Sequence, residues 1–395
     1  MRTLRFPILW ESVAPRSAQE LDWSWPDAQL AWLREAGVRP IAGLLHHGSG
    51  PRFTSLVDPE FPRTFAAFAG AVARRYPWVD AYTPINEPLT TARFSGLYGH
   101  WFPHGRDDAT FVCALLNQCR AITLAMHEIR KVNPNAILVQ TDDLGRTFST
   151  PRLRHQALFD NERRWLAWDL VRGEVGPGHT LWNYLRENGA DDAALDSLGE
   201  NPCPADVIGI NHYVTSDRYL DERLEDYPPE THGANRWERY ADDAAVRTCV
   251  QVSGFAGAIR DAHDRYRTPL ALTEVHLGSA PAEQLRWLAE AWDAATDART
   301  NGVDLRAVTA WSLLGSFDWD SLVTQPNEHY EPGAFDISDG EPRATLLAEA
   351  IAALARGEAL DFPELDECGW WRQPFRLRES ARRRLAGQGM ESAAA

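Results

Sequence analysis

The feature that most constrains the fold of this chain is a repeated alternation between short apolar, β-branched runs and longer amphipathic segments. The short runs predict strands at residues 4–10, 40–47, 79–85, 136–141, 206–213, 270–275 and 308–314. The longer segments predict helices at 27–36, 61–75, 108–132, 249–262, 280–299 and 344–355. Strands that alternate with helices in this way are typical of parallel β/α units. Because seven strands are recognisable and a closed barrel of such units has eight, we expect an α/β fold, a (β/α)8 TIM barrel that lacks its first β/α unit.

Three stretches fit no simple β/α unit. Residues 151–205 have a helical pattern and predict an elaborated crossover, whereas residues 214–248 are polar and predict a long loop over one face. The barrel domain is predicted to span residues 1–358. Residues 359–395 are predicted to form a docked segment that ends in a frayed tail.

Composition narrows the class of function. With 40 basic and 56 acidic side chains the chain carries a net charge of −16, which disfavours a nucleic-acid partner. We find no apolar run long enough to span a membrane and no secretory signal at the start. The five cysteines form no CxxC pair, which favours reduced thiols over disulfides or a metal site. We therefore expect a cytoplasmic protein that binds no membrane, metal or cofactor.

Two predicted strands end in a carboxylate. The strand before Pro88 ends in Asn86 and Glu87, and the strand at 270–275 carries Glu274. The chemistry of parallel barrels lies at the carboxyl ends of their strands. Either glutamate alone is more often a helix cap or a surface charge. Two acids at one barrel mouth, one protonated and one ionised, are what the cleavage of a glycosidic bond requires.

Other strand ends carry side chains suited to the same site. Arg5 lies on the first strand and Tyr213 ends a later one, and either side chain can hold a carboxylate ionised. Trp311 lies on the last predicted strand and offers an apolar face to a sugar ring. His46 and His47 end the second strand, and because adjacent strand residues point opposite ways we expect only one of them to face the pocket.

These residues lie in segments that resemble glycoside hydrolase family 1, the retaining β-glycosidases built on a (β/α)8 barrel. Five segments across most of residues 4–345 match in the family's order: 5–12 (RFPILWES), 83–88 (TPINEP), 209–213 (GINHY), 272–276 (LTEVH) and 311–319 (WSLLGSFDW). The second is similar to the family's acid/base motif T-x-N-E-P, and the fourth to its nucleophile motif I/V-T-E-N-G. Any one of these matches would be weak, and their common order makes the resemblance specific.

The resemblance implies a role for each matched residue. Glu87 would be the acid/base and Glu274 the nucleophile, with Tyr213 orienting Glu274 and Arg5 supporting its charge. Asn86 would bind the sugar 2-hydroxyl. Trp311, Asp318 and Trp319 would line the sugar pocket, together with His46 or His47. Asn211 and His276 lie within matched segments and are further candidate substrate-binding residues, although His276 could equally be a buried histidine with its hydrogen bonds satisfied.

The chain also departs from the family pattern. The family's first strand should precede Arg5, Asp318 stands where the family has a glutamate, and Val275-His276 replace Asn-Gly after the nucleophile. These changes cluster where the family reads the sugar. The closer likeness is to the family-1-like domains associated with dTDP-4-dehydrorhamnose reductase-type proteins, although no GxGxxG follows a strand here.

The function expected from these observations is hydrolysis or transglycosylation of a β-linked glycoside or oligosaccharide by a retaining double displacement. An alternative is a catalytically impaired carbohydrate-binding or scaffold barrel that partners a nucleotide-sugar enzyme. A Schiff-base aldolase is disfavoured because Lys131 falls at a helix end. A gap at the missing strand predicts possible self-association.

Overall fold

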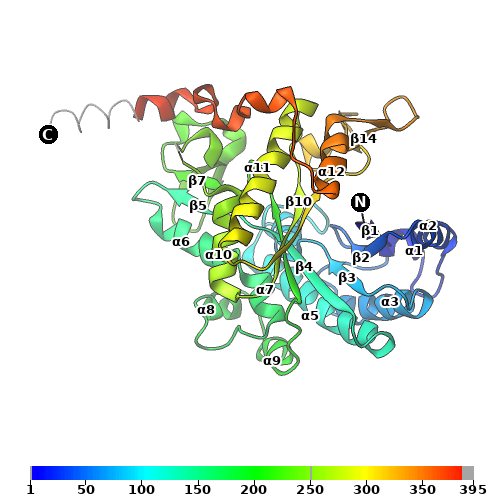
Figure 1. Cartoon of the computed structure of the whole chain (residues 1–395). Helices are drawn as coiled ribbons and strands as arrows, with labels where there is room; N and C mark the ends of the chain where they lie inside the picture. Colours follow the sequence, from blue (N-terminus) through cyan, green and yellow to red (C-terminus); the bar gives the residue numbers. More distant parts are fainter. Residues whose placement is uncertain (1, 250, 385–395) are drawn as a thin grey trace.

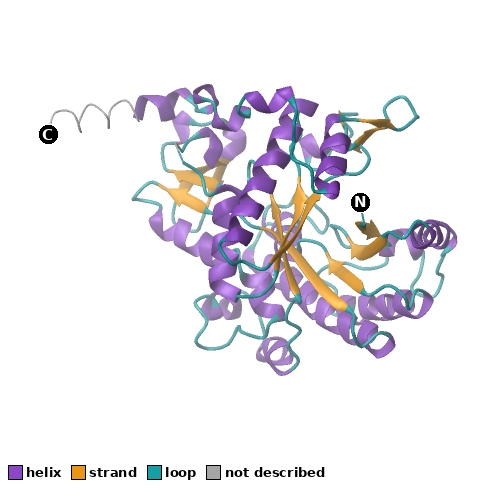
Figure 2. Ribbon diagram, in the orientation of Figure 1, coloured by secondary structure: helices purple, strands orange, loops and turns teal. Residues whose placement is uncertain are grey.

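The structure, a computed structural model, describes residues 2–249 and 251–384. Its centre is a curled sheet of seven parallel strands in the order β1-β2-β3-β4-β6-β10-β11, with helices packed around it (Figures 1 and 2). The strands are β1 (Thr3–Pro7), β2 (Arg39–Leu45), β3 (Ala81–Ile85), β4 (Ile137–Asp143), β6 (Val207–His212), β10 (Leu270–Val275) and β11 (Leu305–Ala310). The predicted α/β barrel with seven strands is confirmed.

The sheet does not close. Strand β1 pairs with β2 and β11 pairs with β10, and among the described residues no strand joins the outer edges of β1 and β11. On β11 the side chains of Arg306 and Ala307 are exposed, which is unusual for a parallel strand because such strands are normally covered on both faces. The open seam lies where the sequence predicts a missing β/α unit.

Two predicted strands have different bounds in the structure. The first strand ends at Pro7, whose nitrogen has no hydrogen to donate to a ladder, and Trp10 begins the short helix α1 (Trp10–Val13) instead. The last strand was predicted too late along the chain. Its pairing of Leu305 with Leu270 sets its start, and it ends at Ala310, so that Trp311 follows the strand and does not lie on it.

Six helices confirm the predicted alternation. They are α2 (Ser24–Glu35), α3 (Phe61–Arg75), α5 (Asp108–Val132), α10 (Gly254–Tyr266), α11 (Pro281–Thr300) and α12 (Leu346–Arg356). Helix α10 begins at Gly254 and not near residue 249, because Asp217 accepts the Gly254 backbone N–H at 2.9 Å and fixes the first turn there. Helix α5 has the length and hydropathy of a membrane span, but 72% of its apolar window is buried inside the protein, where it packs along α3.

Of the two irregular regions predicted within the barrel, the structure confirms one prediction and corrects the other. Residues 151–205 are helical as predicted, with α6 (Arg154–Arg163), α7 (Leu166–Val171), α8 (Trp182–Glu187) and α9 (Asp192–Glu200). The loop predicted at 214–248 is wrong, because this region builds most of a small sheet of order β5-β7-β9-β8. Its strands are β5 (Thr147–Ser149), β7 (Arg218–Asp221), β8 (His232–Ala234) and β9 (Arg239–Ala244). Polar pairs such as Arg218 with Asp242 at 2.8 Å hold it together, so it lacks the apolar alternation that would have revealed it.

The segment after the barrel runs along the outside of the molecule (Figure 1). Trp371 is buried against Trp287, and its indole Nε1 donates to Glu290 at 2.8 Å. Further along, the Arg378 side chain forms an ion pair with Asp243 of the small sheet. The division into a barrel at 1–358 and a docked segment from 359 stays a prediction, and residues 385–395, predicted to fray, lie outside the described residues.

Candidate active site

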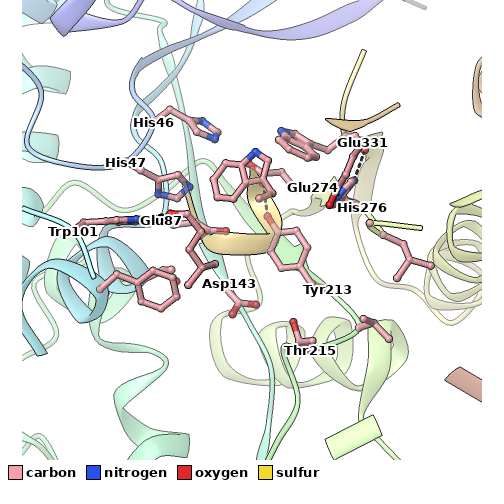
Figure 3. A pocket seen from close by; sticks show the side chains of 18 of the residues that line it. His46, His47, Glu87, Trp101, Asp143, Tyr213, Thr215, Glu274, His276 and Glu331 are labelled. Carbon is pink, nitrogen blue, oxygen red and sulfur yellow. Dashed lines mark hydrogen bonds and ion pairs between the residues drawn. The ribbon is translucent and has the colours of Figure 1, made fainter. Parts of the chain in front are cut away.

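A cavity of about 370 Å³ opens where the sheet strands end, and Figure 3 shows its side chains. This volume lies in the range of small-molecule sites. The lining residues are His46, His47, Glu87, Thr90, Phe94, Trp101, Asp143, Tyr213, Val214, Thr215, Glu274, His276, Leu277, Gly278, Trp311, Trp319, Leu322, Glu331 and Trp370. Eight of the twelve predicted site residues are therefore in the wall: both glutamates, both histidines, Tyr213, His276, Trp311 and Trp319.

Glu87 occupies a sharp turn between a strand and a helix. Strand β3 ends at Ile85, Glu87 has a φ of 47°, and Pro88 begins the short helix α4 (Pro88–Ala92). The turn directs the buried carboxyl into the cavity, where Oε1 accepts a 2.6 Å hydrogen bond from Asn211 Nδ2. Burial, followed by the negative charge of Glu274, raises the pKa of Glu87 well above its usual value. This setting favours the protonated form of Glu87, the form that a general acid needs.

Glu274 lies in the opposite electrostatic setting. It sits on β10 and is also buried, but Arg5 Nη1 contacts its Oε1 at 2.6 Å and the Tyr213 hydroxyl donates to its Oε2. Burial acts to raise the pKa of Glu274. The positive charge of Arg5 and the hydrogen bonds from Arg5 and Tyr213 outweigh burial, so the pKa of Glu274 is held below its usual range. Glu274 is therefore ionised and available as a nucleophile.

Three predicted substrate-binding residues lie behind the two carboxylates and not in the cavity wall. Arg5 Nη2 donates to Asn86 Oδ1 at 2.6 Å, so one guanidinium bridges Glu274 and the residue before Glu87. Asn211 donates to Glu87, and its own Oδ1 accepts from Thr273 at 2.7 Å, which fixes its amide. These contacts fix the position of the Glu87 carboxyl group relative to that of Glu274. The amide nitrogen of Asn86, Nδ2, is buried with no hydrogen-bond partner in the described part of the chain.

The expectation that only one of two adjacent histidines faces the pocket is wrong. Strand β2 ends at Leu45, so the strict alternation of a strand no longer applies to His46 and His47. His47 has a φ of 148°, and both rings line the cavity with their centroids 4.7 Å apart. Burial lowers the pKa of His46, and burial with the neighbouring His46 lowers the pKa of His47 to about 3, so His47 is neutral. His47 Nδ1 lies 3.1 Å from Thr91 Oγ1.

Aromatic rings form the walls predicted for a sugar site. The rings of Trp311 and Trp319 meet edge to face at 5.8 Å, and Trp101 closes the side near His47 at 4.9 Å. The indole of Trp101 donates to the Leu322 carbonyl at 2.8 Å, which ties the loop after α4 to the hairpin after β11. Asp318, predicted beside Trp319, does not line the cavity; its Oδ1 accepts the His329 backbone N–H at 3.0 Å.

Eleven of the nineteen lining residues were not predicted as site residues, among them Asp143, Trp101, Glu331 and Trp370. Asp143 ends β4, and the strand-end rule that found Glu87 would have found it too. Trp101 belongs to a loop whose aromatic residues were visible in the sequence. Glu331 and Trp370 lie on segments without strand or helix periodicity, so no local signal marks them. Lys131 sits at the exposed end of α5, paired with Glu128 at 2.6 Å, which agrees with the argument against a Schiff-base enzyme.

The arrangement places a proton donor and an ionised carboxylate in one aromatic-walled cavity. These are the two groups that acid-assisted cleavage of an acetal such as a glycosidic bond needs. Within residues 2–249 and 251–384, no three His, Cys, Asp or Glu side chains are grouped so as to hold a metal ion.

The fold and the site together place the chain among proteins with two carboxyl groups at the mouth of a β/α barrel. The known proteins that resemble the chain agree with this placement. No family model matches the chain. Beta-glucosidase 4 of Oryza sativa subsp. japonica is 22% identical over 365 residues, which span 80% of this chain and 74% of that protein. Beta-glucosidase 47 of Arabidopsis thaliana is 27% identical over 154 residues, 35% of this chain and 28% of that protein.

Solved structures resemble the chain over most of its length. A family 1 β-glucosidase from Thermotoga maritima has a TM-score of 0.72 at 16% identity, covering 91% of this chain and 84% of that one. A structure of the β-glucosidase from Thermotoga maritima in complex with glucoimidazole has a TM-score of 0.73 with the same identity and coverage. These likenesses show that the chain has the barrel fold of family 1 β-glucosidases.

Proposed function

We propose that the chain hydrolyses or transglycosylates β-linked glycosides by a retaining double displacement. The observation that carries the proposal is the opposite setting of two buried carboxyl groups in one cavity: Glu87 has a raised pKa and Glu274 a lowered one. Two titratable groups pushed apart in this way identify the acid and the nucleophile.

The proposed reaction has two steps. Glu274 attacks the anomeric carbon while Glu87 protonates the departing oxygen, which leaves a sugar bonded to the Glu274 carboxyl. Glu87, now ionised, removes a proton from water or from an acceptor alcohol, which attacks the anomeric carbon and releases Glu274.

The substrate class rests on the relatives. The curated relatives are named β-glucosidases, and one of the similar structures is a β-glucosidase in complex with glucoimidazole. A β-glucoside is therefore the first substrate to test. A carbohydrate-binding barrel without activity is not favoured, because both carboxyl groups keep their hydrogen-bond partners. A cytoplasmic location, a partner enzyme of the dTDP-4-dehydrorhamnose reductase type and self-association stay predictions.

A panel of 4-nitrophenyl β-glycosides tests the proposal. We expect the wild type to release nitrophenol, and Glu274→Gln to release none above background because no attacking carboxylate remains. A 2-fluoro glycoside should label Glu274, located by peptide mass spectrometry, and NMR should show the β-anomer as the first product. A wild type that neither turns over nor becomes labelled would remove the function, and an α-anomer first product would remove the retaining mechanism.

A further inference from the structure

The carboxylate of Glu331 faces the cavity from an unexpected element. Glu331 lies on β13 (Tyr330–Glu331), which pairs with β12 (Ser316–Phe317) in the excursion that follows β11. The residue is only 8% exposed, yet it belongs to the cavity wall. A buried carboxylate that opens only toward a cavity is placed to accept hydrogen bonds from whatever fills it.

His276 holds this carboxylate in place. Its Nε2 lies 2.8 Å from Glu331 Oε2, and its Nδ1 lies 3.2 Å from the Trp311 carbonyl oxygen (Figure 3). The ring thus lies between a carbonyl oxygen and the carboxylate, and the two contacts fix its orientation. On the other side, a Cβ at Gly278 would lie 2.6 Å from Glu331 Oε1, so glycine is needed there to leave the carboxylate room.

The remaining oxygen of Glu331 is available to a ligand. Among the described residues no hydrogen bond to Oε1 is found, and His329 Nε2, at 3.6 Å, is too far away to form one. Asp318, to which the resemblance assigns sugar reading, instead accepts the backbone N–H of His329 and lies outside the cavity wall. Glu331 is thus the carboxylate of this hairpin that faces the substrate space.

The charges around the cavity limit what it accepts. None of the described residues in its wall is Lys or Arg, and four are carboxyl groups: Glu87, Asp143, Glu274 and Glu331. A sugar that carries a carboxylate or phosphate would bring a further negative charge beside these carboxyl groups, with no Lys or Arg in the described wall to pair with it, and burying an unpaired charge is costly.

We propose that Glu331, positioned by His276, reads the hydroxyl groups of an uncharged sugar, so that the cavity accepts neutral glycosides and rejects anionic ones. This inference rests on the proposed glycosidase function and names its substrate class. Glu331 acts as an acceptor for hydroxyl hydrogens and takes no part in bond making.

Kinetics on paired substrates test the inference. We expect Glu331→Gln to lower kcat/KM for 4-nitrophenyl β-glucoside about 10- to 100-fold, the size of one or two lost hydrogen bonds to a charged group. The ratio of kcat/KM for the glucoside to that for the glucuronide should fall. His276→Gln should lower the same ratio, which a merely structural change would leave unmoved. The matched control is Glu328→Gln, which removes the same charge from an exposed position on the hairpin and should leave both values unchanged.

Binding of glucoimidazole, measured by calorimetry, separates the inference from catalysis. A wild type without turnover whose glucoimidazole affinity falls about 10- to 100-fold in Glu331→Gln would refute the function and keep the sugar-reading role. Full turnover with an unchanged substrate ratio in Glu331→Gln would overturn the inference alone. A ratio that falls in Asp318→Asn and not in Glu331→Gln would assign sugar reading to Asp318 and overturn it as well.

Discussion

Arg5 forms a 2.6 Å ion pair with Glu274 although the two residues lie on strands that are not neighbours in the sheet. Arg5 comes from β1, the strand at one side of the open seam, and Glu274 from β10. The same guanidinium reaches Asn86 on the turn that follows β3. The position of an edge strand is thereby coupled to both carboxyl groups, and the seven strands hold the site together without an eighth.

Replacing Arg5 should move the pH profile. In Arg5→Met the charge that lowers the pKa of Glu274 is lost, so that pKa rises and the acidic limb of kcat/KM shifts to higher pH. Activity at neutral pH should fall about 10- to 100-fold, because a hydrogen bond to a charged group is lost. Arg5→Lys, which keeps the charge but cannot bridge two partners, should move the limb less. An acidic limb that stays in place in Arg5→Met would contradict the assigned role.

Glu87 should control the alkaline limb. Burial raises its pKa, which extends the protonated, active form toward higher pH, and kcat/KM should fall as pH rises through that pKa. In Glu87→Gln the alkaline limb should disappear. The rate on a substrate with a poor leaving group should fall about 10²- to 10⁴-fold. The loss should be smaller for a dinitrophenyl glycoside, whose leaving group needs no proton. In Glu87→Ala, added azide should restore turnover and give a β-glycosyl azide. An unaltered alkaline limb in either variant would show that another group is the acid.

The site was predictable where a regular strand leads directly into a functional residue. Glu87 and Glu274 both follow apolar runs that are long enough to be recognised as strands, and parallel strands bring such ends to one mouth. Glu331 and Trp370 belong to segments whose positions depend on long-range pairing, so no local pattern predicts them. The orientation of His47 was misjudged because the strand ends two residues before it. The small sheet was missed because its strands are short and carry many charged residues, such as Arg218 and Asp242.

Asp169 should be a structural anchor far from the chemistry. Its side chain is 1% exposed and accepts from Arg265 and Tyr266, each at 2.7 Å, with His179 Nε2 at 3.2 Å. Burial acts to raise the pKa of Asp169, and these contacts outweigh it and lower that pKa. The stabilisation is therefore present above the unfolded-state value of about 3.9 and is lost as pH falls through the folded value.

Denaturant unfolding tests this anchor. Asp169→Asn should lower the free energy of unfolding by about 3 kcal/mol at pH 7, because a buried ion pair loses one partner. The difference from wild type should shrink as the pH falls toward 3. Asp264→Asn, which breaks an exposed pair with Arg267 at the end of α10, should cost at most about 0.5 kcal/mol. Equal losses in the two variants would show that the buried cluster adds nothing beyond a surface pair.

Substitutions of two adjacent tryptophans in the segment after the barrel should have different effects, one on stability and the other on substrate binding. Trp371 is buried against Trp287, so Trp371→Ala should cost about 3–5 kcal/mol of unfolding free energy through the cavity it leaves. Trp370 is half-buried, stacks under Arg247 at 4.3 Å and lines the active-site cavity. Trp370→Ala should cost only about 1 kcal/mol but raise KM for aryl β-glycosides, because an apolar ring is removed from the wall. Thermal unfolding and steady-state kinetics on the same two proteins measure both effects. A Trp370→Ala protein with wild-type KM would place this segment outside the substrate site and leave it a purely structural strap.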